Sequence, residues 1–187
     1  MKKQLVYILF LSLISLSPFA QQKPADLDKS PMDVSYCPPN YPILKMNGKA
    51  TEQPIARLLY SRPQKNGREI FGGIVIQGEL WRLGANEATE IEFFRNVKVA
   101  GKMLLKGRYT MYAITNGDSW TVIFNTDRDI WGLAHNPKKD VLKIEAKVQN
   151  TESVTEAFTM YFEPVKANNY QFVIAWDKSK ASFPFSY

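Results

Sequence analysis

The sequence predicts an all-β protein, an antiparallel β-sandwich of jelly-roll type. Short runs of alternating apolar and polar residues recur along the chain, with turn signals about every 8–12 residues. No segment longer than about two turns keeps the helical period of roughly 3.6 residues. Asn116-Gly117 is the strongest hairpin signal, because a type I′ turn needs positive φ. These observations predict about nine or ten short strands, with a closed barrel as the alternative architecture.

The strands expected in the first half of the chain are short and are separated by glycine-containing turns. The strand that ends at Phe93 has the clearest pattern, because Thr89, Ile91 and Phe93 share one face while Glu90 and Glu92 share the other. This half is expected to contain strands over 55–61, 74–76, 80–82 and 89–93.

The second half of the chain predicts a series of hairpins. Ala100-Gly101 and Asn116-Gly117 are turn signals that lie between apolar runs. Residues 126–140 form the longest polar interruption, so we expect a loop with at most a single helical turn there. Strands are expected over 97–99, 103–105, 108–115, 120–125, 142–148, 153–163, 169–176 and, as an edge strand that tolerates Pro184, 181–185.

The N-terminus has the three parts of a secretory signal peptide over residues 1–20. Lys2 and Lys3 precede an apolar run over 5–16, and the short segment Ser17-Pro18-Phe19-Ala20 precedes the expected cleavage after Ala20. The apolar run is too short to span a bilayer, which takes about 20 residues. We therefore expect an exported protein of the periplasm or the outer surface, without a transmembrane segment once the signal is removed.

Residues 21–47 are rich in proline and are expected to form an extended lead-in. The prolines leave no room for a helix or a central strand. The β-sandwich domain is expected over 48–187, a length typical of one domain. Cys37 is the only cysteine, so no internal disulfide stabilises the domain, and we expect no catalytic role for its thiol.

The charge pattern excludes one class of partner. The formal charge of +6 falls to +4 without Lys2 and Lys3, and Lys138-Lys139 is the only basic doublet after the signal segment. Nucleic-acid binding requires a clustered basic surface, so no such partner is expected. The sequence also contains no phosphate-binding loop and no metal motif, and we expect no cofactor.

The leading candidate site surrounds Gly84. Trp81 and Arg82 end a strand there, and Asn86, Glu87 and Thr89 follow the turn. An aromatic ring, a forked donor and a carboxylate suit a sugar or a small polar acid. The alternative is that Asn86 and Glu87 cap a turn while Arg82 pairs with a neighbouring carboxylate.

Arg62 belongs to a second candidate group. Arg62 and Arg68 flank a turn at Asn66-Gly67 and are candidates for an anion pocket. Surface ion pairs are common, so pairing of these arginines with Glu69 and Glu79 is the favoured alternative. We include Arg62 among the expected ligand-binding residues.

His135 is a weaker candidate for a general base or a metal ligand. Asp127, Asp129 and Asp140 lie near it in the sequence. A single histidine without a repeated acidic spacing is poor support for a metal site, so an exposed loop histidine is the default expectation.

Seven motifs of the chain occur together in a known family. They are S-P-M-D at 30–33, P-P-N-Y-P at 38–42, Y-S-R-P-Q-K-x-G-R-E-I-F-G at 60–72, W-R-x-G-A-N-E-A-T at 81–89, G-x-Y-T at 107–110, W-T-V-I-F-N at 120–125, and W-G with K-D-V over 131–141. The sequence thus resembles the DUF2911 family, exported proteins of unknown function found mainly in Bacteroidetes-type bacteria. The resemblance implies export but brings no activity, substrate or catalytic residue. Relatives are expected to have an aromatic residue at the position of His135, which argues against a catalytic base there.

We expect a non-catalytic binding protein whose ligand is a carbohydrate or a small polar or anionic molecule. The first alternative is a hydrolase of envelope polysaccharide with Glu87 as acid or base. Such chemistry needs two carboxyl groups about 5–9 Å apart across a cleft, and Glu79, Glu87 and Glu90 are the available candidates. The second alternative is a structural partner of another envelope protein.

Overall fold

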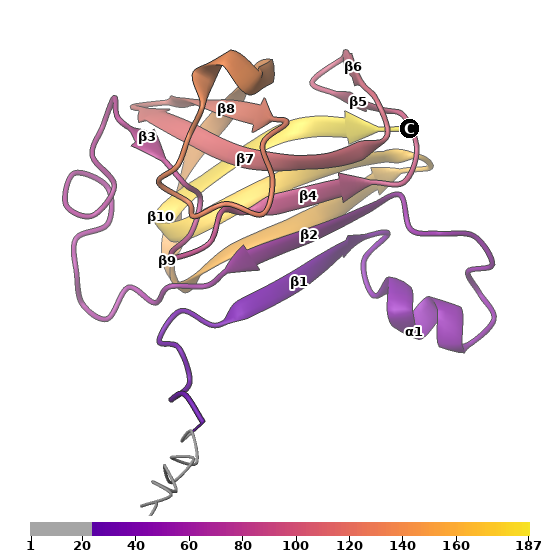
Figure 1. Ribbon diagram of the computed structural model, residues 1–187, viewed down its shortest axis with the longest axis horizontal. Coiled ribbons are helices and arrows are strands. Elements are labelled where there is room, and N and C mark those ends of the chain that lie inside the picture. Colours follow the sequence, from indigo (N-terminus) through magenta and orange to yellow (C-terminus); the bar gives the residue numbers. More distant parts are fainter. Residues whose placement is uncertain (1–23) are drawn as a thin grey trace, which may run out of the picture.

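Ten strands form one antiparallel sheet in the computed structural model, which describes residues 24–187 (Figure 1). The hydrogen-bonded order is β1-β2-β4-β7-β8-β9-β10-β5-β6, and β3 pairs with β7. The expected signal segment lies outside the described residues. The strands are β1 Met32–Cys37, β2 Ala56–Ser61, β3 Leu80–Trp81, β4 Glu90–Phe93, β5 Val97–Val99, β6 Lys102–Leu104, β7 Gly107–Asn116, β8 Ser119–Asn125, β9 Asp140–Lys166 and β10 Asn169–Ser186, and the helices are α1 Tyr41–Met46 and the 3-10 turn η1 Pro137–Lys139.

The sheet curls around a single apolar core. Phe93 of β4 stacks on Phe185 of β10 with ring centroids 5.9 Å apart, although three strands lie between β4 and β10 in the order. Phe162 of β9 lies 5.1 Å from the same Phe185 ring. These contacts enclose the core between distant strands. The all-β antiparallel prediction is confirmed, while the division into two jelly-roll layers stays a prediction.

The β7–β8 hairpin forms where Asn116-Gly117 predicts it. Asn116 pairs with Ser119, and Gly117 has a φ of 44°, as a tight two-residue turn requires. Both faces of β7 are covered, because Met111 faces the core while Tyr112, on the opposite face, is also fully buried. The loop of residues 126–139 covers this second face, where the rings of Tyr112 and His135 lie 4.7 Å apart.

β9 and β10 form one long bent hairpin. The strands expected at 142–148 and 153–163 are continuous in β9. The prediction of an edge strand over 181–185 is wrong, because this segment is the end of β10 and pairs with both β9 and β5. The pairing register shifts around Asp177, which has a φ of 51°. This bulge bends the hairpin, so that both of its halves face the same core.

Two further local predictions are wrong. Residues 74–76 form no strand; Val75 instead donates to the carbonyl of Ile70 at 2.8 Å in a compact turn. The lead-in contains the helix α1, because Pro42 lies in its first turn, where a proline ring is tolerated. It also contains β1, which pairs along β2 at the end of the strand order.

Within residues 24–187, no helix combines the length and the apolar character needed to cross a bilayer.

Candidate functional site

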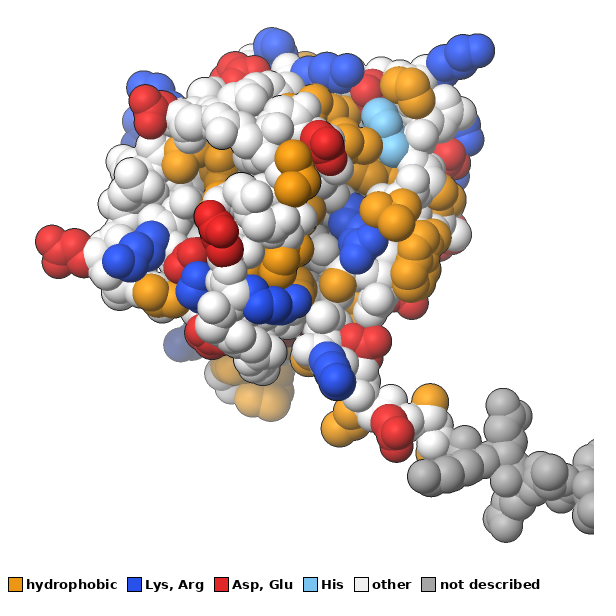
Figure 2. All heavy atoms as spheres, turned by 90° about the vertical axis from the view of Figure 1, so that its left-hand side faces the viewer, with side chains coloured by type: hydrophobic (Ala, Val, Ile, Leu, Met, Phe, Trp, Pro, Cys, Tyr) orange, Lys and Arg blue, Asp and Glu red, His pale blue; other side chains and the backbone are white. Residues whose placement is uncertain are grey.

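Two segments predicted as separate candidates meet at one end of the sheet. The β3–β4 connection (residues 82–89) and the β8–β9 loop (residues 126–139) pair through an isolated antiparallel bridge between Glu87 and Trp131. Ala88 donates to the carbonyl of Ile130 at 3.1 Å, and Gly132 donates to the carbonyl of Asn86 at 2.9 Å. Figure 2 faces this end of the molecule, where hydrophobic, basic and acidic side chains are mixed around the single histidine.

The bend at Gly84 is held tightly against β2. A Cβ at Gly84 would lie 2.8 Å from the hydroxyl oxygen of Ser61, and Gly84 has a φ of 146°, so only glycine fits here. The Ser61 hydroxyl donates to the carbonyl of Ala85 at 2.5 Å and accepts from the Ala85 amide at 2.6 Å. Thr89 donates to the carbonyl of Leu83 at 2.5 Å. These contacts fix the backbone of the β3–β4 connection against β2.

The Trp131 pocket lies on one side of this paired segment. Its volume is about 350 Å³, and Trp131 presents 53% of its surface to solvent. Glu90 accepts from the Asp129 amide at 2.7 Å and pairs with Arg108 at 3.4 Å, and Arg108 also binds the Asp129 carboxylate. The pocket is lined by Met32, Leu59, Glu87, Ala88, Glu90, Asp129, Ile130 and Trp131. Within the described chain, the Glu87 carboxylate is the one in this pocket that has no hydrogen-bond or ion-pair partner.

The Arg82 pocket lies on the other side and is smaller, about 190 Å³. Arg82 donates through Nε to the carbonyl of Gly84 at 3.3 Å, and its Cδ packs over Gly132, where an added Cβ would approach to 2.5 Å. The pocket is lined by Ile74, Val75, Ile76, Glu79, Leu80, Trp81, Arg82, Gly84 and Leu133. Of the expected site residues, Trp81 and Arg82 line this pocket and Glu87 lines the Trp131 pocket. Asn86 lines neither, and its side-chain amide donates to the Asp28 carboxylate at 3.0 Å.

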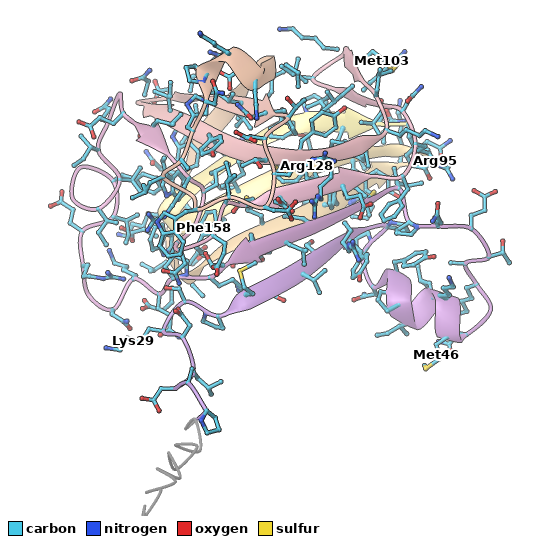
Figure 3. The ribbon with its side chains drawn as sticks, in the orientation of Figure 1. Lys29, Met46, Arg95, Met103, Arg128 and Phe158 are labelled. Atoms are coloured by element: carbon cyan, nitrogen blue, oxygen red, sulfur yellow. The ribbon has the colours of Figure 1, made fainter. Side chains whose placement is uncertain are left out.

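Trp81 is a core residue. Only 8% of it is exposed, and its ring stacks on Trp176 at 6.0 Å and meets Phe158 edge-on at 5.1 Å. Phe71 and Trp120 complete this aromatic cluster. Figure 3 shows Phe158 at the end of the sheet that carries the two pockets, while Arg95 and Met103 lie at the opposite end. Trp81 supports the pocket wall and presents no open aromatic face.

Arg62 and Thr89 line neither pocket. Arg62 pairs with Asp33 at 2.9 Å and donates to the carbonyl of Phe158 at 3.0 Å and to the hydroxyl of Thr159 at 2.8 Å. Its partners come from β1 and β9, so it joins three strands. Arg68 binds backbone carbonyls of its own turn, and neither arginine pairs with the expected Glu69 or Glu79.

His135 is not the exposed loop residue that the sequence suggested. Its Nε2 lies 2.8 Å from Oδ1 of Asp140, and its side chain is 14% exposed. Asn125 also donates to Asp140 at 2.8 Å, and Lys143 lies 3.0 Å from it. Burial acts to raise the pKa of Asp140, but hydrogen bonds from His135, Asn125 and Lys143 outweigh it and lower that pKa. The contact between His135 and Asp140 holds the loop of residues 126–139 against the start of β9.

Cys37 lies away from both pockets and is fully buried. Burial raises the pKa of its thiol to about 12, although a hydrogen bond with Tyr170 acts in the opposite direction. The thiol is therefore protonated at neutral pH, which makes it a poor nucleophile.

Comparison with known proteins identifies the family. A family model described as "Protein of unknown function (DUF2911)" matches residues 45–185, most of the chain. The chain belongs to the DUF2911 family. Neither the curated proteins nor the solved structures contain a match to it. The resemblance seen in the motifs is confirmed, and the chemistry of this DUF2911 protein has to be inferred from its own residues.

No metal site emerges in the DUF2911 chain as far as it is described. Over residues 24–187, no group of three or more His, Cys, Asp or Glu side chains is arranged to hold an ion. His135 has a single carboxylate partner, and Lys143 and Asn125 occupy the rest of the Asp140 carboxylate.

The pocket residue that sequence reasoning underrated in this DUF2911 protein is Trp131, which is half exposed. The sequence places it four residues before His135 in a polar loop, and loops on a rigid scaffold often carry binding residues. The sequence favours Trp81 as a ligand-binding residue because it directly precedes the turn at Arg82–Gly84. The alternation of the 80–82 strand does not show which of its faces is covered, and the structure puts Trp81 on the core side.

Proposed function

We propose that this protein binds a carbohydrate in the Trp131 pocket and does not catalyse a reaction on it. The observation that carries the proposal is the half-exposed indole of Trp131 beside the unpartnered carboxylate of Glu87. Both groups are fixed by the bridge between the β3–β4 connection and the β8–β9 loop.

The chemistry of a sugar ring suits this arrangement. One face of a pyranose carries C–H groups that pack on an aromatic plane, and an indole offers the largest such plane. The hydroxyls at the ring edge donate hydrogen bonds, and a carboxylate acceptor makes these stronger than a neutral acceptor does. Trp131 and Glu87 provide the plane and the acceptor in adjacent positions.

The remainder of the pocket supports a neutral ligand that is partly apolar. Met32, Leu59 and Ile130 contribute apolar surface, and no basic side chain lines the pocket. Its volume of about 350 Å³ lies in the range of about 300–1,000 Å³ typical of small-molecule sites. An anionic sugar would meet Glu87, Glu90 and Asp129 without a lining cation, so a neutral saccharide is favoured.

The hydrolase alternative has one observation in its favour. Glu87, the proposed acid or base, shares the pocket with Glu90 and Asp129. Glycosidases use two carboxyl groups on opposite sides of the scissile bond. Here Arg108 already binds both Glu90 and Asp129, which leaves Glu87 as a single available group and favours binding over cleavage.

Affinity electrophoresis of the chain without residues 1–20 in gels that contain neutral polysaccharides tests the proposal. We expect retardation by at least one neutral glucan, mannan or xylan, lost in Trp131→Ala and weakened in Glu87→Gln. Leu133→Ala is the matched control, because Leu133 is exposed on the same loop but lines the other pocket. Retention by no polysaccharide, or equal retention of Trp131→Ala, contradicts the proposal, and release of reducing ends that is lost in Glu87→Gln supports the hydrolase instead.

Export is part of the same proposal. Cell-wall polysaccharides are met outside the cytoplasm, which agrees with the signal peptide expected at residues 1–20. Fractionation of cells that express the full chain tests this, and we expect the mature protein outside the cytoplasm with an N-terminus at Gln21.

A further inference from the structure

We propose that the Arg82 pocket is a second, separate site, which binds a free α-amino acid with a branched aliphatic side chain. The pocket brings together one cation, one anion and four exposed aliphatic side chains. These are the three features that a small zwitterion with an apolar side chain requires.

The two charged side chains of the pocket, Glu79 and Arg82, form no ion pair with each other. Glu79 and Arg82 both line it, yet no ion pair within 4.0 Å joins them, and neither pairs with another charged residue among residues 24–187. Arg82 uses only Nε, on the carbonyl of Gly84, so both terminal nitrogens of its guanidinium have no protein acceptor in the described chain. Opposite charges in one small pocket that do not reach one another are complementary to a ligand that carries both signs.

The contacts of Arg82 fix its guanidinium in a position where it can bind a carboxylate. Gly132 leaves space for the Arg82 stem, since an added Cβ would lie 2.5 Å from Cδ, and the Gly84 carbonyl orients Nε. A planar guanidinium with its position fixed binds a carboxylate through two parallel hydrogen bonds. The exposed carboxylate of Glu79 is then the acceptor for the ammonium group of the ligand.

The apolar part of the pocket selects the side chain. The aliphatic residues Ile74, Ile76, Leu80 and Leu133 are 45%, 44%, 40% and 71% exposed. Their burial against an aliphatic ligand side chain would remove apolar surface from water, which favours binding. Trp81 shows almost none of its ring, so the wall is aliphatic rather than aromatic in character.

The size of the pocket excludes larger ligands. At about 190 Å³ it lies below the range of roughly 300–1,000 Å³ of sites for drug-sized molecules. A single amino acid is a ligand of the appropriate scale, whereas a disaccharide or a nucleotide is too large. The ligand class therefore differs from that of the Trp131 pocket, and the two proposals can fail independently.

Isothermal titration calorimetry with L-leucine tests the site. Three probes each remove one feature: 4-methylpentanoate lacks the ammonium group, isoamylamine lacks the carboxylate, and glycine lacks the side chain. We expect saturable binding of L-leucine and at least a tenfold weaker affinity for each of the three probes. Absence of saturable heat with L-leucine at millimolar concentration, or equal affinity for 4-methylpentanoate, overturns the proposal.

Two variants locate the binding to this pocket. Arg82→Met keeps the aliphatic stem over Gly132 and Glu79→Gln changes an exposed side chain, so both are expected to unfold near the wild-type temperature. Each is expected to weaken L-leucine binding at least tenfold, while the exposed controls Arg128→Met and Glu152→Gln leave it unchanged. Unchanged binding in Glu79→Gln overturns the zwitterion assignment even if Arg82→Met does not fold.

Discussion

Glu87 and Trp131 pair across an isolated antiparallel bridge, and the two segments that this bridge joins line two pockets of different chemistry. On one side the indole and the carboxylate of these two residues face solvent together. On the other side Arg82 lies against Gly132, the next residue of the same loop. A strand connection and a distant loop thus build both surfaces, and changes to their shared backbone should affect both.

We expect Gly84→Ala to lower the free energy of unfolding by about 2–4 kcal/mol, from backbone strain and overpacking together. The φ of 146° disfavours any Cβ, and the new atom would lie 2.8 Å from the Ser61 hydroxyl oxygen. Urea denaturation measures the change. Gly101→Ala is the control, because Gly101 also has positive φ but no atom within 4 Å of the added Cβ, so about 1–2 kcal/mol is expected there. Equal losses at the two positions would show that the Ser61 contact contributes nothing.

Arg62→Met should destabilise the fold without changing either binding activity. The guanidinium has three partners from β1 and β9 and its side chain is one-third exposed, so the expected loss is about 1–2 kcal/mol after allowance for solvent screening. Thermal unfolding with Asp33→Asn and the double variant measures the coupling. A selective loss of carbohydrate or leucine binding in folded Arg62→Met would support the sequence-based prediction that Arg62 belongs to a ligand site.

The sequence predicts most of the sheet because the signals that carry it are local. Alternation identifies β4, and the Gly117 turn identifies the β7–β8 hairpin, since each pattern depends on neighbouring residues only. The strand prediction over 74–76 is wrong for the same reason. This segment has strand composition, but no partner strand is available to it, and its residues turn back on Ile70.

The candidate site is predicted less completely, because burial of a particular ring depends on tertiary contacts. The sequence predicts Trp81 as the ligand-stacking ring, yet Trp176 and Phe158 cover it, whereas Trp131 of the predicted loop is half exposed. Arg62 likewise has its partners in β1 and β9, far away in the sequence. Arg82 and Glu87 line surface pockets, as expected. Both pockets are completed by the loop of residues 126–139, which is distant in the sequence.

The Asp140 carboxylate should make stability depend on pH in the acid range. Its pKa in the folded state is lowered from 3.8, whereas the unfolded value is about 3.9. A lowered folded pKa contributes stability that is complete above about pH 4 and is lost as pH falls through the folded pKa. Asp140→Asn is therefore expected to differ most from wild type above about pH 4 and to approach it near pH 2.

Urea denaturation of Asp140→Asn between pH 2 and pH 7 measures this difference. The charged and titratable groups around Asp140 are His135, Lys143 and, near Tyr112, Asp127 with its partner Lys139. Glu152→Gln, at an exposed position of β9, is the control and should follow the wild-type profile. A constant difference between Asp140→Asn and wild type across this range would mean that the carboxylate charge is not responsible.

The two tryptophans provide the sharpest separation of fold from function. Trp81→Ala removes a ring packed against Trp176 and Phe158, and we expect a loss of about 3–5 kcal/mol of unfolding free energy. Trp131→Ala removes a half-exposed ring, and we expect a change within about 0.5 kcal/mol. Retardation by polysaccharide should show the reverse order, with Trp131→Ala inactive and Trp81→Phe, which retains a ring in the core, close to wild type. If Trp81→Phe folds normally but no longer binds, the aromatic surface that contacts the sugar includes Trp81, and Trp81 is not a core residue alone.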